Sequence, residues 1–237
     1  MGYIKDFILP SLVVAAVSYL LGSLSFSIIF TKLFSKTDIR TLGSGNAGTT
    51  NVLRSVGPSA ALFTLVFDFA KGVISVLIGR YVFLYAAGLV GAPAIAGDYG
   101  AYLAGLLCVI GHIYPLYYKF KGGKGVLTSS AMIAMVDWRV FVIVIAIFII
   151  MLLITRIVSL SSLAAAWSFP VSNFLLAYFV DYHLNVSVEG PVFLTYVFVS
   201  TAIAAAMAVL LTVKHKSNIE RIKNGTEKKI SVHHKEK

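Results

Sequence analysis

The sequence predicts an all-α integral membrane protein with about seven transmembrane helices, its N-terminus outside and its C-terminus in the cytoplasm. Three observations predict this class. The chain is 58 % hydrophobic and 13 % charged, whereas a soluble domain is about 45–50 % apolar and about 25 % charged. The apolar residues form long uninterrupted runs, and the basic residues are confined to the polar connections at alternate ends of those runs.

Seven apolar stretches are the candidate spans. They cover 7–34, 60–79, 98–118, 126–136, 140–155, 160–180 and 192–213. Backbone groups in hydrocarbon need internal hydrogen bonds, and these runs do not alternate as barrel strands would, so we expect helices. The fourth stretch is short, which leaves five or six full spans open. The first exceeds the roughly 7–15 residues of a signal-peptide core, so we expect a retained span.

The basic residues predict the orientation. One set of connections and the tail carries sixteen Lys and Arg residues, and the other set carries three: Lys5, Arg80 and Arg139. The positive-inside rule places the first set in the cytoplasm. We therefore expect one polytopic membrane domain over 1–237, with cytoplasmic loops at about 35–59 and 119–125 and a cytoplasmic tail at about 214–237.

The first cytoplasmic loop combines glycines with cations and neutral donors. Glycines can turn the backbone sharply and present N–H groups to an anion, and two flanking arginines can clamp phosphate or carboxylate. A solvated loop with tight turns is the alternative, but this mixture in so apolar a chain favours an anion site. The candidate residues are Arg40, Gly43, Ser44, Gly45, Asn46, Gly48, Asn51 and Arg54.

The second loop is a glycine-rich basic turn directly before an apolar helix. Gly122, Gly123 and Gly125 surround Lys124, and a helix N-terminus offers free N–H groups and a positive dipole end. The spacing does not fit a nucleotide-binding P-loop, because Gly125 stands where Ser or Thr is needed. A basic turn that only fixes the topology is the alternative to an anion-binding loop.

The tail carries a third polar group. His215, Asn218 and Arg221 step by three and would share one face of a helix, and Gly225 and Glu227 follow. A juxtamembrane helix that only grips anionic lipid would account for the lysines. It would not require a histidine, an asparagine and a glutamate, so we favour a functional role.

Ionisable residues also lie inside predicted spans. Asp68 and Lys71 are three residues apart, so they can pair with each other, and His112 lies in the third span. Such residues are costly in a membrane and are commonly functional or paired. Both a structural and a site-lining role stay open for all three. The serines at 159, 161 and 162 are interpreted as a helix start.

These groups occur together in an order that resembles a known family. The segments are 43–51 (GSGNAGTTN) with Arg54, 68–72 (DFAKG), 111–112 (GH), 122–126 (GGKGV), and the tail residues 215–229. They resemble the bacterial acyl-phosphate:glycerol-3-phosphate acyltransferases over nearly the whole chain. The resemblance implies a seven-helix enzyme of the bacterial inner membrane, with its active site facing the cytoplasm.

The resemblance also implies the reaction. A fatty acyl group would pass from acyl phosphate to the 1-hydroxyl of glycerol 3-phosphate, giving lysophosphatidic acid and phosphate, the first step of phospholipid synthesis. The expected partners are these two substrates, membrane lipid and an upstream enzyme that forms acyl phosphate; no nucleic acid, cofactor or metal is expected. The expected catalytic residues are Ser44, Arg54, Lys124 and His215. The expected substrate-binding residues are Arg40, Gly43, Gly45, Asn46, Gly48, Asn51, Asp68, Lys71, His112, Gly122, Gly123, Gly125, Asn218, Arg221, Gly225 and Glu227.

The residue inventory agrees with that chemistry. Acyl phosphate is already activated, so the enzyme needs no covalent nucleophile, and the chain shows no Gly-x-Ser-x-Gly sequence. It must hold two phosphorylated molecules together and stabilise an oxyanion. The alternative is a transporter or channel for a phosphorylated anion. The outer connections are short and nearly free of cations, which disfavours a path through the membrane.

Overall fold

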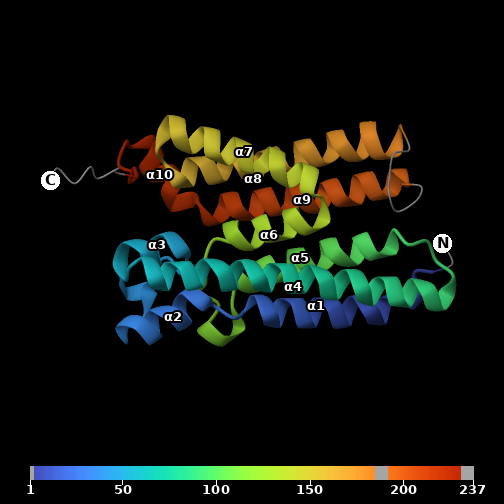
Figure 1. Ribbon diagram of the computed structural model, residues 1–237, viewed down its shortest axis with the longest axis horizontal. Helices are drawn as coiled ribbons and strands as arrows, with labels where there is room; N and C mark the ends of the chain where they lie inside the picture. The colour runs from blue at the N-terminus through green and yellow to red at the C-terminus, as the bar shows by residue number, and fades with distance from the viewer. Residues whose placement is uncertain (1–2, 185–191, 231–237) are drawn as a thin grey trace.

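The computed structural model describes residues 3–184 and 192–230, and every long regular element in these ranges is a helix (Figure 1). This confirms the all-α prediction. The last seven residues of the predicted tail lie outside the described residues. The helices are α1 (Ile8–Gly22), α2 (Phe26–Ser35), α3 (Thr49–Ser55), α4 (Pro58–Val90), α5 (Ala96–Ile113), α6 (Val126–Val136), α7 (Trp138–Thr155), α8 (Val158–Leu175), α9 (Leu194–Lys214) and α10 (Lys216–Lys223); a π-helix, Leu176–Tyr182, continues α8.

Six helical segments in the described part of the chain are long and apolar enough to cross a membrane. The stretch predicted at 126–136 forms α6, with 11 residues. A helix of that length is about 16 Å long, roughly half the hydrocarbon thickness of about 30 Å. The structure therefore gives six helices of spanning length and one half-length helix.

The helices form two layers with α6 between them (Figure 1). In one layer α5 packs against α1 and α4, and in the other α8 packs against α7 and α9. Small residues allow the closest approach: a Cβ on Gly79 would lie 2.2 Å from the carbonyl oxygen of Gly100. Close packing of this kind drives helix association in lipid, where the hydrophobic effect gives little. Both α3 and α10 lie at the same end of the bundle (Figure 1).

The first span is broken, in contrast to the single helix expected over 7–34. Three residues separate α1 from α2. The break frees backbone carbonyls, and a lysine from the next span satisfies two of them. The Nζ of Lys71 lies 3.0 Å from the Gly22 oxygen and 2.6 Å from the Leu24 oxygen. A break inside a span is tolerated where protein groups pair the released backbone atoms.

The second span is longer than expected. The prediction ended it at Gly79 because Arg80 follows, and this boundary is wrong: α4 continues to Val90. Arg80 stays within the helix because its Nη2 donates a 2.8 Å hydrogen bond to Asp98 at the start of α5. An ionised side chain is accepted at this depth when a neighbouring helix supplies its partner.

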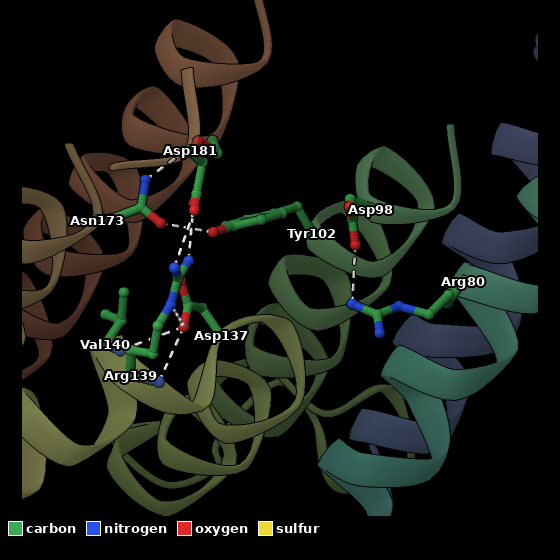
Figure 2. Close-up of polar contacts among 9 residues, drawn as sticks. Arg80, Asp98, Tyr102, Asp137, Arg139, Val140, Asn173 and Asp181 are labelled. Atoms are coloured by element: carbon green, nitrogen blue, oxygen red, sulfur yellow. Dashed lines mark hydrogen bonds and ion pairs between the residues drawn. The ribbon is translucent and has the colours of Figure 1, made fainter. Parts of the chain in front are cut away.

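Polar side chains hold the corner between α6 and α7 against the π-helix (Figure 2). Asp137 caps α7 by accepting a 2.8 Å bond from the Arg139 backbone. The Arg139 guanidinium bridges both aspartates of the cluster, with Nη2 2.7 Å from Asp137 Oδ2 and 2.7 Å from Asp181 Oδ2. Nearby, the Tyr102 hydroxyl donates to the Asn173 amide oxygen at 2.6 Å. The Arg139 bonds tie the corner after the half-length helix to the π-helix, and the Tyr102–Asn173 bond joins α5 to α8, which belong to different layers.

Candidate functional site

The first polar loop is built around a buried asparagine. The Asn51 amide donates to the carbonyls of Leu42 at 3.0 Å and Asn46 at 3.1 Å, and its oxygen accepts the Ser44 N–H at 3.0 Å. Gly43 has a φ of +55°, and a Cβ there would lie 2.3 Å from the Asn51 oxygen. Glycine is therefore needed where the loop closes. The hydrogen bonds of the Asn51 side chain stabilise the loop itself and are not free for a ligand.

Two predicted catalytic residues of this loop face outward. Ser44 and Arg54 are both exposed, and the Arg54 side chain has no hydrogen bond or ion pair with the residues that the structure describes. Asn46 is half-buried, and Gly45, like Gly43, has a positive φ. Gly48 precedes α3. A cation and a hydroxyl are thus left available to a ligand.

The second loop needs its glycines because it passes directly over other backbone. A Cβ on Gly122 would lie 2.1 Å from the His112 carbonyl oxygen, and one on Gly123 would lie 2.2 Å from the His112 ring and 2.5 Å from the Ala47 oxygen. Gly125, with a φ of +85°, starts α6. The two loops therefore touch at Gly123 and Ala47.

The tail folds back to form one connected polar group. The Lys124 ammonium donates to the Asn218 amide oxygen, and the Asn218 amide donates to Glu227 Oε1 at 2.6 Å. Arg221 Nε donates to the other Glu227 oxygen at 2.6 Å. Asn218 and Arg221 thus use the same helix face, as expected from their spacing. Gly225, with a φ of +68°, turns the chain so that Glu227 can reach them.

Ser159 belongs to this group, although the sequence suggested only a helix start. Its hydroxyl donates to Glu227 Oε1 at 2.6 Å. Glu227 therefore has three side-chain donors: Ser159, Asn218 and Arg221. One serine after a basic residue gives no recognisable spacing, so the sequence carried no signal for this contact.

The protonation states follow from these surroundings. Burial lowers the pKa of Lys124 to about 8, although the Glu227 carboxylate opposes the shift. Burial also lowers the pKa of His215 to about 4, so this imidazole is neutral at neutral pH. Its Nδ1 lies 2.8 Å from the Leu211 oxygen. For Glu227, burial raises the pKa, but the hydrogen bonds from Ser159, Asn218 and Arg221 outweigh it, and the pKa is lowered.

The ionisable residues of the spans lie beneath the second loop. Lys71 Nζ is 2.7 Å from Asp68 Oδ1 and 3.0 Å from His112 Nδ1. All three side chains are buried, and the His112 ring supports Gly123 from below. Their contacts run from the break in the first span to the glycine loop, so the structure joins these two features through one cluster.

Arg40 lies apart from the Lys124 group. Its guanidinium binds Asp38, with Nη2 2.6 Å from Oδ2, and its Nη1 donates to the Tyr118 oxygen at 2.9 Å. Arg40 therefore links the start of the first loop to the segment before the second loop. The Arg40 guanidinium therefore bonds to groups of the protein itself.

The fold and these side chains together define an integral membrane protein with a candidate anion site at one end of a helical bundle. A family described as "Glycerol-3-phosphate acyltransferase" matches residues 12–225. The chain belongs to this family, and it is an acyltransferase.

Curated relatives and solved structures agree with this assignment. A glycerol-3-phosphate acyltransferase of Coxiella burnetii is 36 % identical over 216 residues, which are 91 % of this chain and 96 % of the relative. One of Thermoanaerobacter is 37 % identical over 91 % of this chain and 93 % of the relative. The crystal structure of PlsY, an integral membrane glycerol 3-phosphate acyltransferase, in its glycerol 3-phosphate form is similar with a TM-score of 0.75 and 30 % identity. That match covers 93 % of this chain and 96 % of the other.

Proposed function

We propose that this protein transfers a fatty acyl group from acyl phosphate to the 1-hydroxyl of glycerol 3-phosphate, releasing lysophosphatidic acid and phosphate. The observation that carries the proposal is the position of Lys124. It contacts the tail through Asn218, and its loop touches the first loop at Ala47. A cation at this junction can bind a phosphate that both segments surround. The similar structures solved in glycerol 3-phosphate and lysophosphatidic acid forms support the same substrate and product.

The residue roles follow from exposure and contacts. Ser44 and Arg54 face outward and are the ligands that we assign to the first loop. Lys124, Asn218 and Arg221 supply cationic and amide donors from the other side. Neutral His215 is assigned to orienting the reacting groups, and Glu227 to fixing the tail donors or accepting a glycerol hydroxyl. The N–H groups of Gly122 and Gly123 already donate to the carbonyl oxygens of Ile113 and His112, so we assign these two glycines to shaping the loop. Gly125, at the start of α6, is the glycine that we assign to presenting a backbone N–H to the anion.

The chemistry requires positioning more than activation. The mixed anhydride of acyl phosphate already has a good leaving group. The enzyme can therefore accelerate the reaction by holding the hydroxyl next to the carbonyl carbon and by stabilising the oxyanion that forms. The departing phosphate can accept the hydroxyl proton, and then no further base is needed. We assign Asn51, Asp68, Lys71 and His112 to holding the loops, because their side chains bond to the protein itself.

We further propose that seven helices lie in the membrane, with α6 as a half-length arm paired with α7. This count, with the sixteen-to-three distribution of basic residues, puts the N-terminus outside and the site in the cytoplasm. The membrane is then the bacterial inner membrane. There, an upstream enzyme would deliver acyl phosphate to the interface, with the acyl tail among the helices and the phosphate at Lys124.

One assay tests the reaction. The purified full chain in detergent is supplied with glycerol 3-phosphate and either acyl phosphate or acyl-CoA, and lysophosphatidic acid is measured. We expect product from acyl phosphate alone. Equal product from acyl-CoA would overturn the donor assignment. No product from either donor in folded protein would refute the proposed reaction.

A further inference from the structure

A second basic site is formed by residues of the first loop and of the segment that leads into the second loop. It is a surface cavity of about 420 Å³, whose lining includes Asp38, Arg40, Lys119 and Lys121. This volume falls in the range of about 300–1,000 Å³ that is usual for small-molecule sites. The lining includes Gly45 and Gly122 of the two glycine loops but neither Lys124 nor any tail residue, so the cavity borders the candidate site without including the group around Glu227.

The cavity has an excess of positive charge. Asp38 neutralises Arg40, because both of its carboxylate oxygens accept hydrogen bonds from the guanidinium. Arg40 also donates to the Tyr118 oxygen, so it is held in place in the lining of the cavity. Lys119 and Lys121 are exposed and form no ion pair with any residue that the structure describes. The four charges therefore leave a surplus of two, carried by lysines that are free to bind an anion.

Exposed apolar residues flank the two lysines in the sequence, and the backbone at this turn is unusual. Leu116 is 47 % exposed and Phe120 is 54 % exposed, and Tyr117 between them is exposed as well. Lys119 and Phe120 have φ values of +57° and +58°. This left-handed conformation costs energy for residues other than glycine and tends to occur at functional sites. The two lysines therefore belong to a turn that also carries exposed apolar residues.

We propose that this cavity binds the phosphate of an anionic phospholipid from the surrounding membrane. Lys119 and Lys121 contact the phosphate, while Leu116, Tyr117 and Phe120 lie against the acyl chains. Basic clusters at a membrane surface attract anionic lipids, and aromatic side chains favour the interface. The exposed apolar residues next to the two lysines in the sequence favour a lipid over a soluble phosphate, because a small hydrophilic ion makes no use of three exposed apolar side chains.

The test measures lipid binding without turnover, so it stands even if the proposed acyltransferase reaction fails. The full chain in nonionic detergent is titrated with phosphatidylglycerol, phosphatidylcholine or inorganic phosphate, and bound molecules are counted by native mass spectrometry. The variant is Lys119→Gln/Lys121→Gln. The matched control, Lys223→Gln/Lys228→Gln, removes the same charge from exposed positions in the tail.

We expect the wild type and the control to bind phosphatidylglycerol in preference to phosphatidylcholine, and the variant to bind it roughly ten-fold or more weakly. Equal affinity of the variant and the control for phosphatidylglycerol would refute the proposed lipid site. Tight binding of inorganic phosphate at the same lysines would assign the cavity to a soluble anion instead. A rise in the glycerol 3-phosphate KM of the variant, with no change in lipid binding, would assign the cavity to the substrate site.

Discussion

The Lys124 ammonium donates a hydrogen bond to the Asn218 amide oxygen, although 94 residues separate the two positions in the chain. This bond connects the glycine loop before α6 with the tail helix α10. Glu227 extends the connection by holding Asn218 and Arg221. A substitution in any of these segments is therefore expected to affect the same ligand.

Lys124→Ala should lose most activity, about a hundred-fold in kcat, while the protein stays folded. The loop lies at the end of the bundle, so we expect replacement to cost little stability, whereas removing one cation from a phosphate on which charge develops typically costs that much in rate. Steady-state kinetics and thermal unfolding in detergent measure the two effects. Lys223→Ala serves as the control. Near-normal turnover of folded Lys124→Ala would reduce this loop to a topological anchor.

Arg54→Ala and Arg221→Ala should each raise the glycerol 3-phosphate KM roughly ten-fold, because losing one charged contact costs about 1.4 kcal/mol or more. The double variant should show less than the product of the two effects, since residues that share a ligand are coupled. Kinetics of the three variants decide this. Wild-type kinetics in either single variant would contradict the shared site.

Activity should fall as the pH rises through about 8. The pKa of Lys124 is lowered to about 8 by burial, so the charged form that binds phosphate is present below this pH and is lost above it. We expect kcat/KM for acyl phosphate to drop about ten-fold per pH unit on the alkaline side. Lys124→Arg should abolish that limb, because guanidinium stays charged. A wild-type profile that is flat well above pH 8 would refute the assignment.

Lys71→Met should destabilise the protein by about 3 kcal/mol or more, because it leaves Asp68 as an unpaired buried charge. It also removes the donor to the Gly22 and Leu24 carbonyls. Unfolding in detergent measures the loss. Adding Asp68→Asn should recover part of it, since the charge left unpaired is then removed. A Lys71→Met protein as stable as the wild type would show that the cluster does not hold the first span.

A reporter fused after Lys237 should be active only if it functions in the cytoplasm. The sixteen-to-three distribution of Lys and Arg residues gives this expectation. Paired fusions to a cytoplasmic and a periplasmic reporter make the measurement. Activity of the periplasmic reporter would reverse the orientation and place the candidate site on the outer face.

Much of the helical pattern could be predicted because its boundaries carry local signals. The bounds of α6 match the predicted stretch, since Gly125 starts the helix and Asp137 ends it. The end of α4 was missed because a charged Arg80 resembles a connection until its partner in α5 is known. The break after Gly22 was also missed, because the carbonyls that it releases are satisfied by a lysine about fifty residues later.

The candidate site could be predicted in composition but not in arrangement. The sequence predicted both Asn51 and Arg54 as ligands. Spacing alone does not give the direction of a side chain, so it could not distinguish a buried residue from an exposed one. The structure separates them: Asn51 is buried in loop contacts and Arg54 is exposed. Ser159 gave no signal at all, since only the folded tail brings Glu227 to it.

The contact between Lys71 and the broken first span has a consequence for biogenesis. The first hydrophobic segment leaves the ribosome with two carbonyls that nothing in that segment satisfies, and the next segment brings a lysine that is costly to release into lipid alone. Each segment supplies the group that the other lacks. We therefore expect the translocon to retain the first segment until α4 has been synthesised, and to release the two into the bilayer as a hairpin.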